Sequence, residues 1–209
     1  MSDPNEIAEA LLEQILAAPR AGRRRLIAIV GPPASGKSTL SEILADRMTA
    51  AGRKTQVIPM DGFHLDNQIL SEQGLLTRKG APETFDVEGL LRLVKALPGS
   101  DAVYFPIFDR ARDIAIASAG MVSGESDSVI VEGNYLLLDA LGWRDLRDCW
   151  DFAIQLDVQR SVLKERLVKR WLAHGLTPEQ ALERAEMNDL RNAALVATES
   201  MLADVAIKI

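Results

Sequence analysis

The stretch GPPASGKST, residues 31–39, decides the fold of this chain. It matches the pattern G-x-x-x-x-G-K-[S/T], in which two glycines let the backbone curl until its N–H groups face inward. The apolar run LIAIV at 26–30 predicts a buried strand before it, and a helix is expected from about Lys37 to Ala51. This motif requires a strand and a helix on either side, so a chance glycine-rich turn is the weaker interpretation. The stretch therefore predicts a phosphate-binding loop at a helix N-terminus.

The side chains of this loop have predicted roles in binding a nucleotide. Lys37 is expected to reach the terminal phosphates, and the Ser38 hydroxyl to bind Mg²⁺. Glu132 ends the predicted strand at 128–133 and is expected near Ser38 as a second metal ligand, because ligands of open parallel sheets bind beyond the carboxyl ends of the strands. An exposed loop glutamate is the alternative. The predicted nucleotide contacts are Gly31, Pro33, Ala34, Ser35, Gly36, Lys37, Ser38 and Thr39.

A second stretch, VIPMDGFHLDN at 57–67, places a carboxylate at the end of another predicted strand. Asp61 can face the same crevice as the loop, where a carboxylate can accept a proton from an attacking hydroxyl or orient it. The alternative is a plain turn, because Asp-Gly pairs often start turns and Gly62 follows directly.

The remaining pattern extends this arrangement to the whole chain. Short apolar strands alternate with helices, which predicts an α/β fold with a doubly wound, mostly parallel sheet of five or six strands and helices on both faces. A first amphipathic helix is expected within residues 1–20, and the last long helix is expected to run from Thr177 toward Ala203. The strands are expected at 26–30, 55–60, 102–108, 128–133, 151–157 and 205–209.

Composition excludes several classes of protein. The 209 residues suit one domain, and the net charge of −6 argues against a dedicated nucleic-acid binder. Cys149 is the single cysteine, so no disulfide can form within the chain. No apolar run approaches the roughly 18 residues that span a membrane, and no signal-peptide pattern occurs, so a cytoplasmic protein is expected. The basic run at 23–25 is predicted to be a solvated entry to the first strand.

Taken together, these motifs resemble the phosphoribulokinase/uridine kinase family of P-loop kinases. The segment from Met60 to Val94 is similar to type I pantothenate kinases and to bacterial proteins labelled as fructose transport system kinases. FPIFDRARD at 105–113 and VIVEGNYLLLD at 129–139 resemble the second group more closely. The uridine kinases have tyrosine where this chain has Phe108.

The resemblance implies a single kinase domain, 1–209, that uses ATP and Mg²⁺ to phosphorylate a hydroxyl of a small molecule. It implies Asp61 as the base, a substrate-side insert at 62–85 and a helical lid at about 159–185. Arg166 and Arg170 fall in the lid and share one helix face, where they could stabilise the transferring phosphoryl group. A solvated helix face is the alternative.

Six residues are candidates for contacts with the acceptor: His64, Arg78, Lys79, Asp86, Phe108 and Arg112. Five of them have a structural alternative, namely surface charge for Arg78 and Lys79, a helix cap for Asp86, and a structural role or core packing for His64 and Phe108. The roles of Asn188 and Asn192 stay undecided between nucleotide and water.

Three classes of function are consistent with part of this pattern. The leading hypothesis is a small-molecule kinase for a sugar such as fructose, with a nucleoside or pantothenate as the alternative acceptor. A non-catalytic ATP-binding regulatory protein associated with a transporter would need no base at Asp61. A GTPase is disfavoured because the chain contains no N-K-x-D motif. A homodimer is left open.

Overall fold

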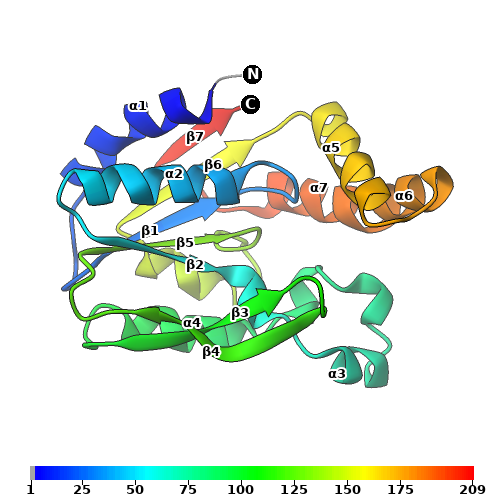
Figure 1. Cartoon of the computed structure of the whole chain (residues 1–209), viewed down its shortest axis with the longest axis horizontal. Helices are drawn as coiled ribbons and strands as arrows, with labels where there is room; N and C mark the ends of the chain where they lie inside the picture. The colour runs from blue at the N-terminus through cyan, green and yellow to red at the C-terminus, as the bar shows by residue number, and fades with distance from the viewer. Residues whose placement is uncertain (1–2) are drawn as a thin grey trace.

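A five-stranded parallel sheet forms the centre of the computed structural model, which describes residues 3–209. The strand order is β2-β5-β1-β6-β7, and every neighbouring pair is parallel. Figure 1 shows the strands with their carboxyl ends toward the helices α5 and α6. The predicted doubly wound α/β fold is confirmed. The strands are β1 (Arg25–Val30), β2 (Thr55–Pro59), β5 (Ser128–Gly133), β6 (Phe152–Asp157) and β7 (Val205–Lys208).

Helices cover both faces of this sheet because alternate side chains of each buried strand point to opposite sides. Ile27 and Ile29 of β1 pack in a core with α1 (Pro4–Ala17) and α2 (Lys37–Ala50). Their neighbours Ala28 and Val30 pack in a second core with α4 (Val87–Ala96). In Figure 1, α2 crosses in front of the sheet between β6 and β1, whereas α4 is drawn fainter and lower, behind the β3–β4 hairpin at residues 103–122.

A separate antiparallel hairpin, β3 (Val103–Asp109) and β4 (Ile114–Val122), lies outside the parallel sheet. The strand expected at 102–108 exists but pairs only with β4, which the sequence analysis missed. The sequence of β4 is rich in Ala, Ser and Gly and is mostly exposed, so it offers neither a continuous apolar run nor a strict alternation. The tip of this hairpin reaches the carboxyl end of the sheet, where it contributes to the site described below.

Three helices follow β6: α5 (Arg160–Ala173), α6 (Pro178–Arg184) and α7 (Leu190–Glu199). Thr177 starts α6 with a capping box. The helix predicted from Thr177 toward Ala203 is present from Pro178 to Glu199, but a π-helical turn at Ala185–Asp189 divides it into α6 and α7. The wider turn buries Asn188 and Asp189. Among the described residues, none of the helices is both long and apolar enough to cross a membrane.

The segment between β2 and α4 consists of short helical pieces rather than one loop. A 3₁₀ turn at Met60–Phe63 is followed by α3 (Asn67–Glu72) and by 3₁₀ turns at Leu76–Arg78 and Pro82–Thr84. A further 3₁₀ helix at Arg144–Cys149 precedes β6.

Arg24 contradicts the prediction that the basic run at 23–25 is solvated. Its side chain is fully buried and donates four hydrogen bonds of 2.6–2.9 Å to backbone carbonyls, those of Leu97, Ser100, Asp101 and Ser123. Arg25 is also buried and donates to carbonyls at the end of α1. Arg24 therefore ties β1 to the end of α4 and to the start and end of the β3–β4 hairpin.

Replacing Arg24 with methionine is expected to destabilise the protein by about 3 kcal/mol or more, because it leaves several buried carbonyls without a donor. Urea unfolding followed by circular dichroism measures the loss. Arg23→Met is the matched control: that side chain is 46% exposed, and its ion pair with Asp101 should contribute less than about 1 kcal/mol. Equal losses in the two variants would contradict the assignment.

Candidate active site

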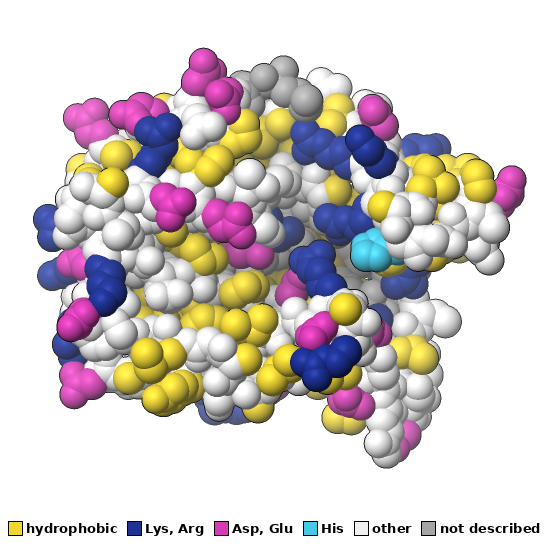
Figure 2. Space-filling model, viewed as in Figure 1, with side chains coloured by type: hydrophobic (Ala, Val, Ile, Leu, Met, Phe, Trp, Pro, Cys, Tyr) yellow, Lys and Arg dark blue, Asp and Glu magenta, His cyan; other side chains and the backbone are white. Residues whose placement is uncertain are grey.

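A cleft of about 1020 Å³ opens beyond the carboxyl ends of β1, β2 and β5. The P-loop and the start of α2 form its floor, and α5, the β3–β4 tip and the segment after β2 form its walls. Figure 2 shows Lys and Arg side chains gathered around a hollow on this side of the molecule. Polyanions such as nucleotide phosphates suit such a cleft.

The backbone of the P-loop takes the shape that phosphate binding needs. Ala34 and Gly36 have positive φ angles of 63° and 95°, and α2 begins immediately afterward at Lys37. Left-handed residues next to a helix start turn successive N–H groups toward one point. The hydroxyl oxygen of Ser35 is buried and has no hydrogen-bond partner among the described residues. The loop thus presents donors to the cleft.

Ser38 and Glu132 lie together at the floor of the cleft. The Ser38 hydroxyl donates to Glu132 Oε1 at 3.0 Å, and Glu132 is 6% exposed. Burial raises the pKa of Glu132, against the effect of Lys37, and burial lowers the pKa of Lys37, against the effects of Glu132 and Asp61. The charges of Lys37 and Glu132 therefore stabilise each other, whereas burial alone disfavours the charged form of both side chains.

Asp61 is carried by the 3₁₀ turn after β2, and two glycines bring this turn close to its neighbours. A Cβ atom on Gly62 would lie 2.1 Å from the Pro106 carbonyl oxygen, and one on Gly133 would lie 2.6 Å from the Met60 side chain. Gly62 thus allows a close approach to β3, rather than the left-handed backbone angle for which turns often use glycine. Asp61 lines the cleft, where its Oδ2 accepts from Arg110 Nη2 at 2.9 Å.

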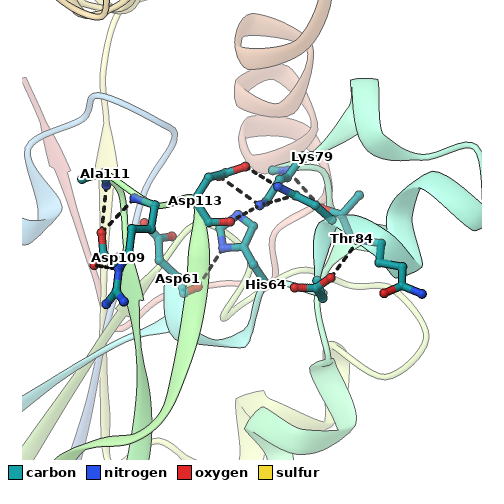
Figure 3. Close-up of polar contacts among 12 residues, drawn as sticks. Asp61, His64, Lys79, Thr84, Asp109, Ala111 and Asp113 are labelled. Carbon is teal, nitrogen blue, oxygen red and sulfur yellow. Dashed lines mark hydrogen bonds and ion pairs between the residues drawn. The ribbon is translucent and has the colours of Figure 1, made fainter.

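His64 packs beside Asp61 at the wall of the cleft. Its Nδ1 lies 2.7 Å from the Asp61 carbonyl oxygen, which assigns the proton to Nδ1 because a carbonyl can only accept. Its ring centroid lies 4.1 Å from that of Phe85 and 4.7 Å from that of Phe108. Burial lowers the pKa of His64, so the neutral ring presents Nε2 as an acceptor (Figure 3).

The lowered pKa of His64 predicts a pH dependence of stability. The unfolded chain takes up a proton near pH 6.5 while the folded protein resists it, so stability present above that pH is lost as the pH falls. The free energy of unfolding, measured with urea between pH 7.5 and 5, should therefore fall less for His64→Gln than for the wild type. His174→Gln, at an exposed histidine, should decline like the wild type. Parallel curves for all three proteins would refute the role of His64.

Two arginines of α5, Arg166 and Arg170, line the cleft. Arg166 Nη1 donates to the carbonyls of Ala34 and Ser35 at 3.1 and 3.4 Å. The side chain of Arg170 is partly buried, and no hydrogen bond or ion pair joins that side chain to another residue within 3–209. Burial and the nearby Arg110 lower the pKa of Arg170, while Asp189 and Asp61 act to raise it. A desolvated guanidinium of this kind suits an anion.

Three of the predicted acceptor residues lie in the cleft, and three do not. His64, Lys79 and Phe108 line it. Asp86 lies outside it and caps α4, accepting from Gly89 N at 2.8 Å.

Arg78 and Arg112 also lie outside the cleft, bonded within the protein. Arg78 Nη1 donates to Asn188 Oδ1 at 2.7 Å, and Arg112 Nε donates to Asp109 Oδ2 at 2.7 Å. Asn188 and Asn192 in turn donate to the carbonyls of Lys79 and Gly80, so these asparagines join the C-terminal helices to the acceptor segment.

Several cleft residues were not predicted from the sequence: Arg110, Asp113, Asn134, Trp171 and Asp189. The sequence does not show which of Arg110 and Arg112 faces Asp61. Only the shape of the hairpin tip decides this. Trp171 Nε1 donates to Asp189 Oδ2 at 2.6 Å across the π-helical turn, a contact between separate helices that leaves no local signal. Asn134 directly follows Gly133, the last residue of β5. Its position at the end of a strand could have suggested it as a site residue.

Three kinds of comparison relate this chain to known proteins. A family model for "Methylmalonyl Co-A mutase-associated GTPase MeaB" matches residues 1–64, a part that contains the P-loop and β2 but less than half of the chain. A Schizosaccharomyces pombe protein named "Putative uridine kinase" is 34% identical over 197 residues, which cover 89% of this chain and 83% of that protein. The pantothenate kinase of Enterococcus faecalis is 32% identical over 150 residues, 70% of this chain and 49% of that enzyme.

Among solved structures, the crystal structure of a "putative fructose transport system kinase" from Silicibacter sp. TM1040 superposes with a TM-score of 0.91. It is 50% identical in sequence and covers 99% of this chain and 100% of its own. The uridine kinase relative extends over most of both chains. This chain therefore belongs to the phosphoribulokinase/uridine kinase family of P-loop kinases.

Proposed function

We propose that this kinase uses ATP and Mg²⁺ and transfers the γ-phosphoryl group to a hydroxyl of a small molecule. The observation that carries the proposal is the position of Asp61. It lies at the wall of the same cleft as Lys37 and Ser38, close enough to influence the pKa of Lys37. A carboxylate beside the phosphate end of a nucleotide site is what an acceptor hydroxyl needs for activation.

The P-loop is proposed to hold the phosphates of ATP through its inward N–H groups, with Lys37 neutralising the terminal charge. The lid, about 159–185, is proposed to supply Arg166 and Arg170. Arg166 already lies on the loop backbone, and the guanidinium of Arg170 faces the cleft without a hydrogen bond or ion pair to the described residues. Positively charged groups there stabilise the charge spread over the transferring group.

Ser38 and Glu132 fit a magnesium site of the kind that kinases use. They bring a hydroxyl and a carboxylate oxygen together at 3.0 Å, both hard oxygen donors. Mg²⁺ commonly takes one or two protein oxygens and completes its shell with phosphate oxygens and water. When bound, the ion would neutralise charge on the β- and γ-phosphates.

The chemical role of Asp61 follows from its surroundings. An acceptor hydroxyl between Asp61 and the P-loop would give its proton to the carboxylate as its oxygen attacks the γ-phosphorus. The rings of Phe85 and Phe108 and the neutral His64 wall this side and limit the access of water. The segment at 62–85 is thus proposed as the acceptor side of a single kinase domain, 1–209.

The acceptor is proposed to be a small alcohol of the sugar, nucleoside or pantothenate type. Support comes from the relatives, which are named for uridine, pantothenate and a fructose transport system. The test is an ADP-release assay with ATP and Mg²⁺ over fructose, uridine, pantothenate and related alcohols. ADP release that depends on one of these acceptors is expected. If ATP binds but no acceptor in the panel raises ADP release above the background, the chain is better explained as a regulatory ATP-binding protein.

A further inference from the structure

The side chain of Arg110 occupies the acceptor side of the cleft next to Asp61. Its Nη2 lies 2.9 Å from Asp61 Oδ2, and the two side chains are 60% and 30% exposed. A guanidinium has five N–H donors, and within residues 3–209 only this one bond uses any of them. Arg110 therefore retains donors that an incoming molecule can reach.

The hairpin tip that carries Arg110 is held in place by a network of polar contacts. Asp109 accepts from the backbone N–H groups of Ala111 and Arg112, each at 3.0 Å. Asp113 has a positive φ of 56°, an unfavourable backbone angle for this residue, and it persists where surrounding contacts enforce it. Lys79 Nζ and Asn67 Nδ2 supply those contacts, at 3.0 and 2.7 Å from the Asp113 carboxylate (Figure 3).

Lys79 is a second cation on this side of the cleft, and its donors already bond to other residues of the protein. Lys79 has three donors, and its Nζ contacts Asn67 Oδ1 at 2.6 Å, the Asp113 carbonyl at 3.1 Å and the Asp113 carboxylate at 3.0 Å. It also lies 5.0 Å from the centre of the Phe108 ring. Lys79 is thus a structural residue. Arg110 is the cation that is hydrogen-bonded to Asp61 and still has donors to spare.

We propose that Arg110 binds a carboxylate or phosphate group of the acceptor, so that this kinase acts on anionic alcohols rather than neutral ones. This inference rests on the proposed kinase function. The planar guanidinium matches either anion through paired hydrogen bonds. Partly exposed ion pairs are weak, so an anion can take the place of Asp61 on Arg110. The exchange leaves the Asp61 carboxylate beside the acceptor hydroxyl, whose proton it receives.

The test compares charged and neutral members of matched alcohol pairs: pantothenate with pantothenol, glycerate with glycerol, and fructose 6-phosphate with fructose. The first two pairs probe a carboxylate and the third probes a phosphate. The wild type should phosphorylate a charged member in preference to its neutral partner. Arg110→Gln should raise KM for that charged member by about 10- to 100-fold, the effect of losing hydrogen bonds to a charged group. Arg112→Gln, on the same tip but bonded to Asp109 outside the cleft, should leave KM unchanged.

The outcomes separate this inference from the proposed function. Turnover of a neutral member with an unchanged KM in Arg110→Gln overturns the inference and leaves the kinase function standing. An equal fall of kcat for every acceptor in Arg110→Gln also overturns it, because Arg110 then acts on the phosphoryl group.

Calorimetry with the P-loop occupied by ADP and Mg²⁺ covers the case of no turnover. Binding of a charged probe that Arg110→Gln abolishes supports the anion site while counting against the kinase function. Absence of binding by all three charged probes overturns the inference.

Discussion

Replacing Asp61 with asparagine is expected to lower kcat by about 10²- to 10⁴-fold, the usual contribution of a general base. The change keeps the size of the side chain but removes the carboxylate that would accept the hydroxyl proton. ATP affinity should change little, because the P-loop and Lys37 supply the nucleotide contacts proposed for this cleft. Steady-state ADP release gives kcat, and calorimetry with a non-hydrolysable ATP analogue gives the affinity.

Asp66→Asn is the matched control for this change. Asp66 is an exposed carboxylate five residues later, and it caps α3 by accepting from Gln68 N at 2.8 Å. Asparagine caps helices as well as aspartate does, so the fold and kcat should be preserved. Wild-type turnover in Asp61→Asn would remove Asp61 from the chemistry.

Replacing Arg170 with alanine is expected to lower kcat by about 10³- to 10⁵-fold, the range found for arginines that stabilise phosphoryl transfer. The side chain of Arg170 faces the cleft near Asp61 and Arg110 and has no hydrogen bond or ion pair to another described residue, so little of the ligand-free structure depends on it. Single-turnover measurements with saturating ATP separate the chemical step from binding.

Lys169→Ala is the control for Arg170→Ala, because Lys169 is an exposed cation on the same helix. It should turn over normally. Arg170→Lys keeps the charge but loses the planar donor fork, and it should recover only part of the loss. If Arg170→Ala and Lys169→Ala have the same kcat, α5 contributes no catalytic charge through Arg170.

Local pattern was enough to predict the part of the fold around the P-loop. The strand β1, the loop and α2 follow each other directly, and burial on both faces makes β1 a continuous apolar run. Long-range contacts were not visible in this way. Arg24 looks like surface charge in the sequence, yet its four carbonyl partners come from residues at least 73 positions later in the chain. The sequence around Arg24 contains no pattern that predicts these four partners.

The same distinction applies to the site. Asp61 and Glu132 were found because Asp61 follows β2 and Glu132 lies at the end of β5, and the carboxyl ends of parallel strands meet at one edge of the sheet. The acceptor side depends instead on how the β3–β4 tip folds over the segment after β2. Sequence alone therefore favoured Arg112, whereas the structure places Arg110 on Asp61.

Transfer of the γ-phosphoryl group to an alcohol is the central claim, and following labelled phosphate tests it most directly. The protein is incubated with γ-labelled ATP, Mg²⁺ and the acceptor that raises ADP release most, and the products are separated by chromatography. The account predicts that the label leaves ATP and appears on the acceptor as an alkali-stable phosphate ester, and that Asp61→Asn loses this product. Label found only as inorganic phosphate, in equal amounts with and without acceptor, would contradict it.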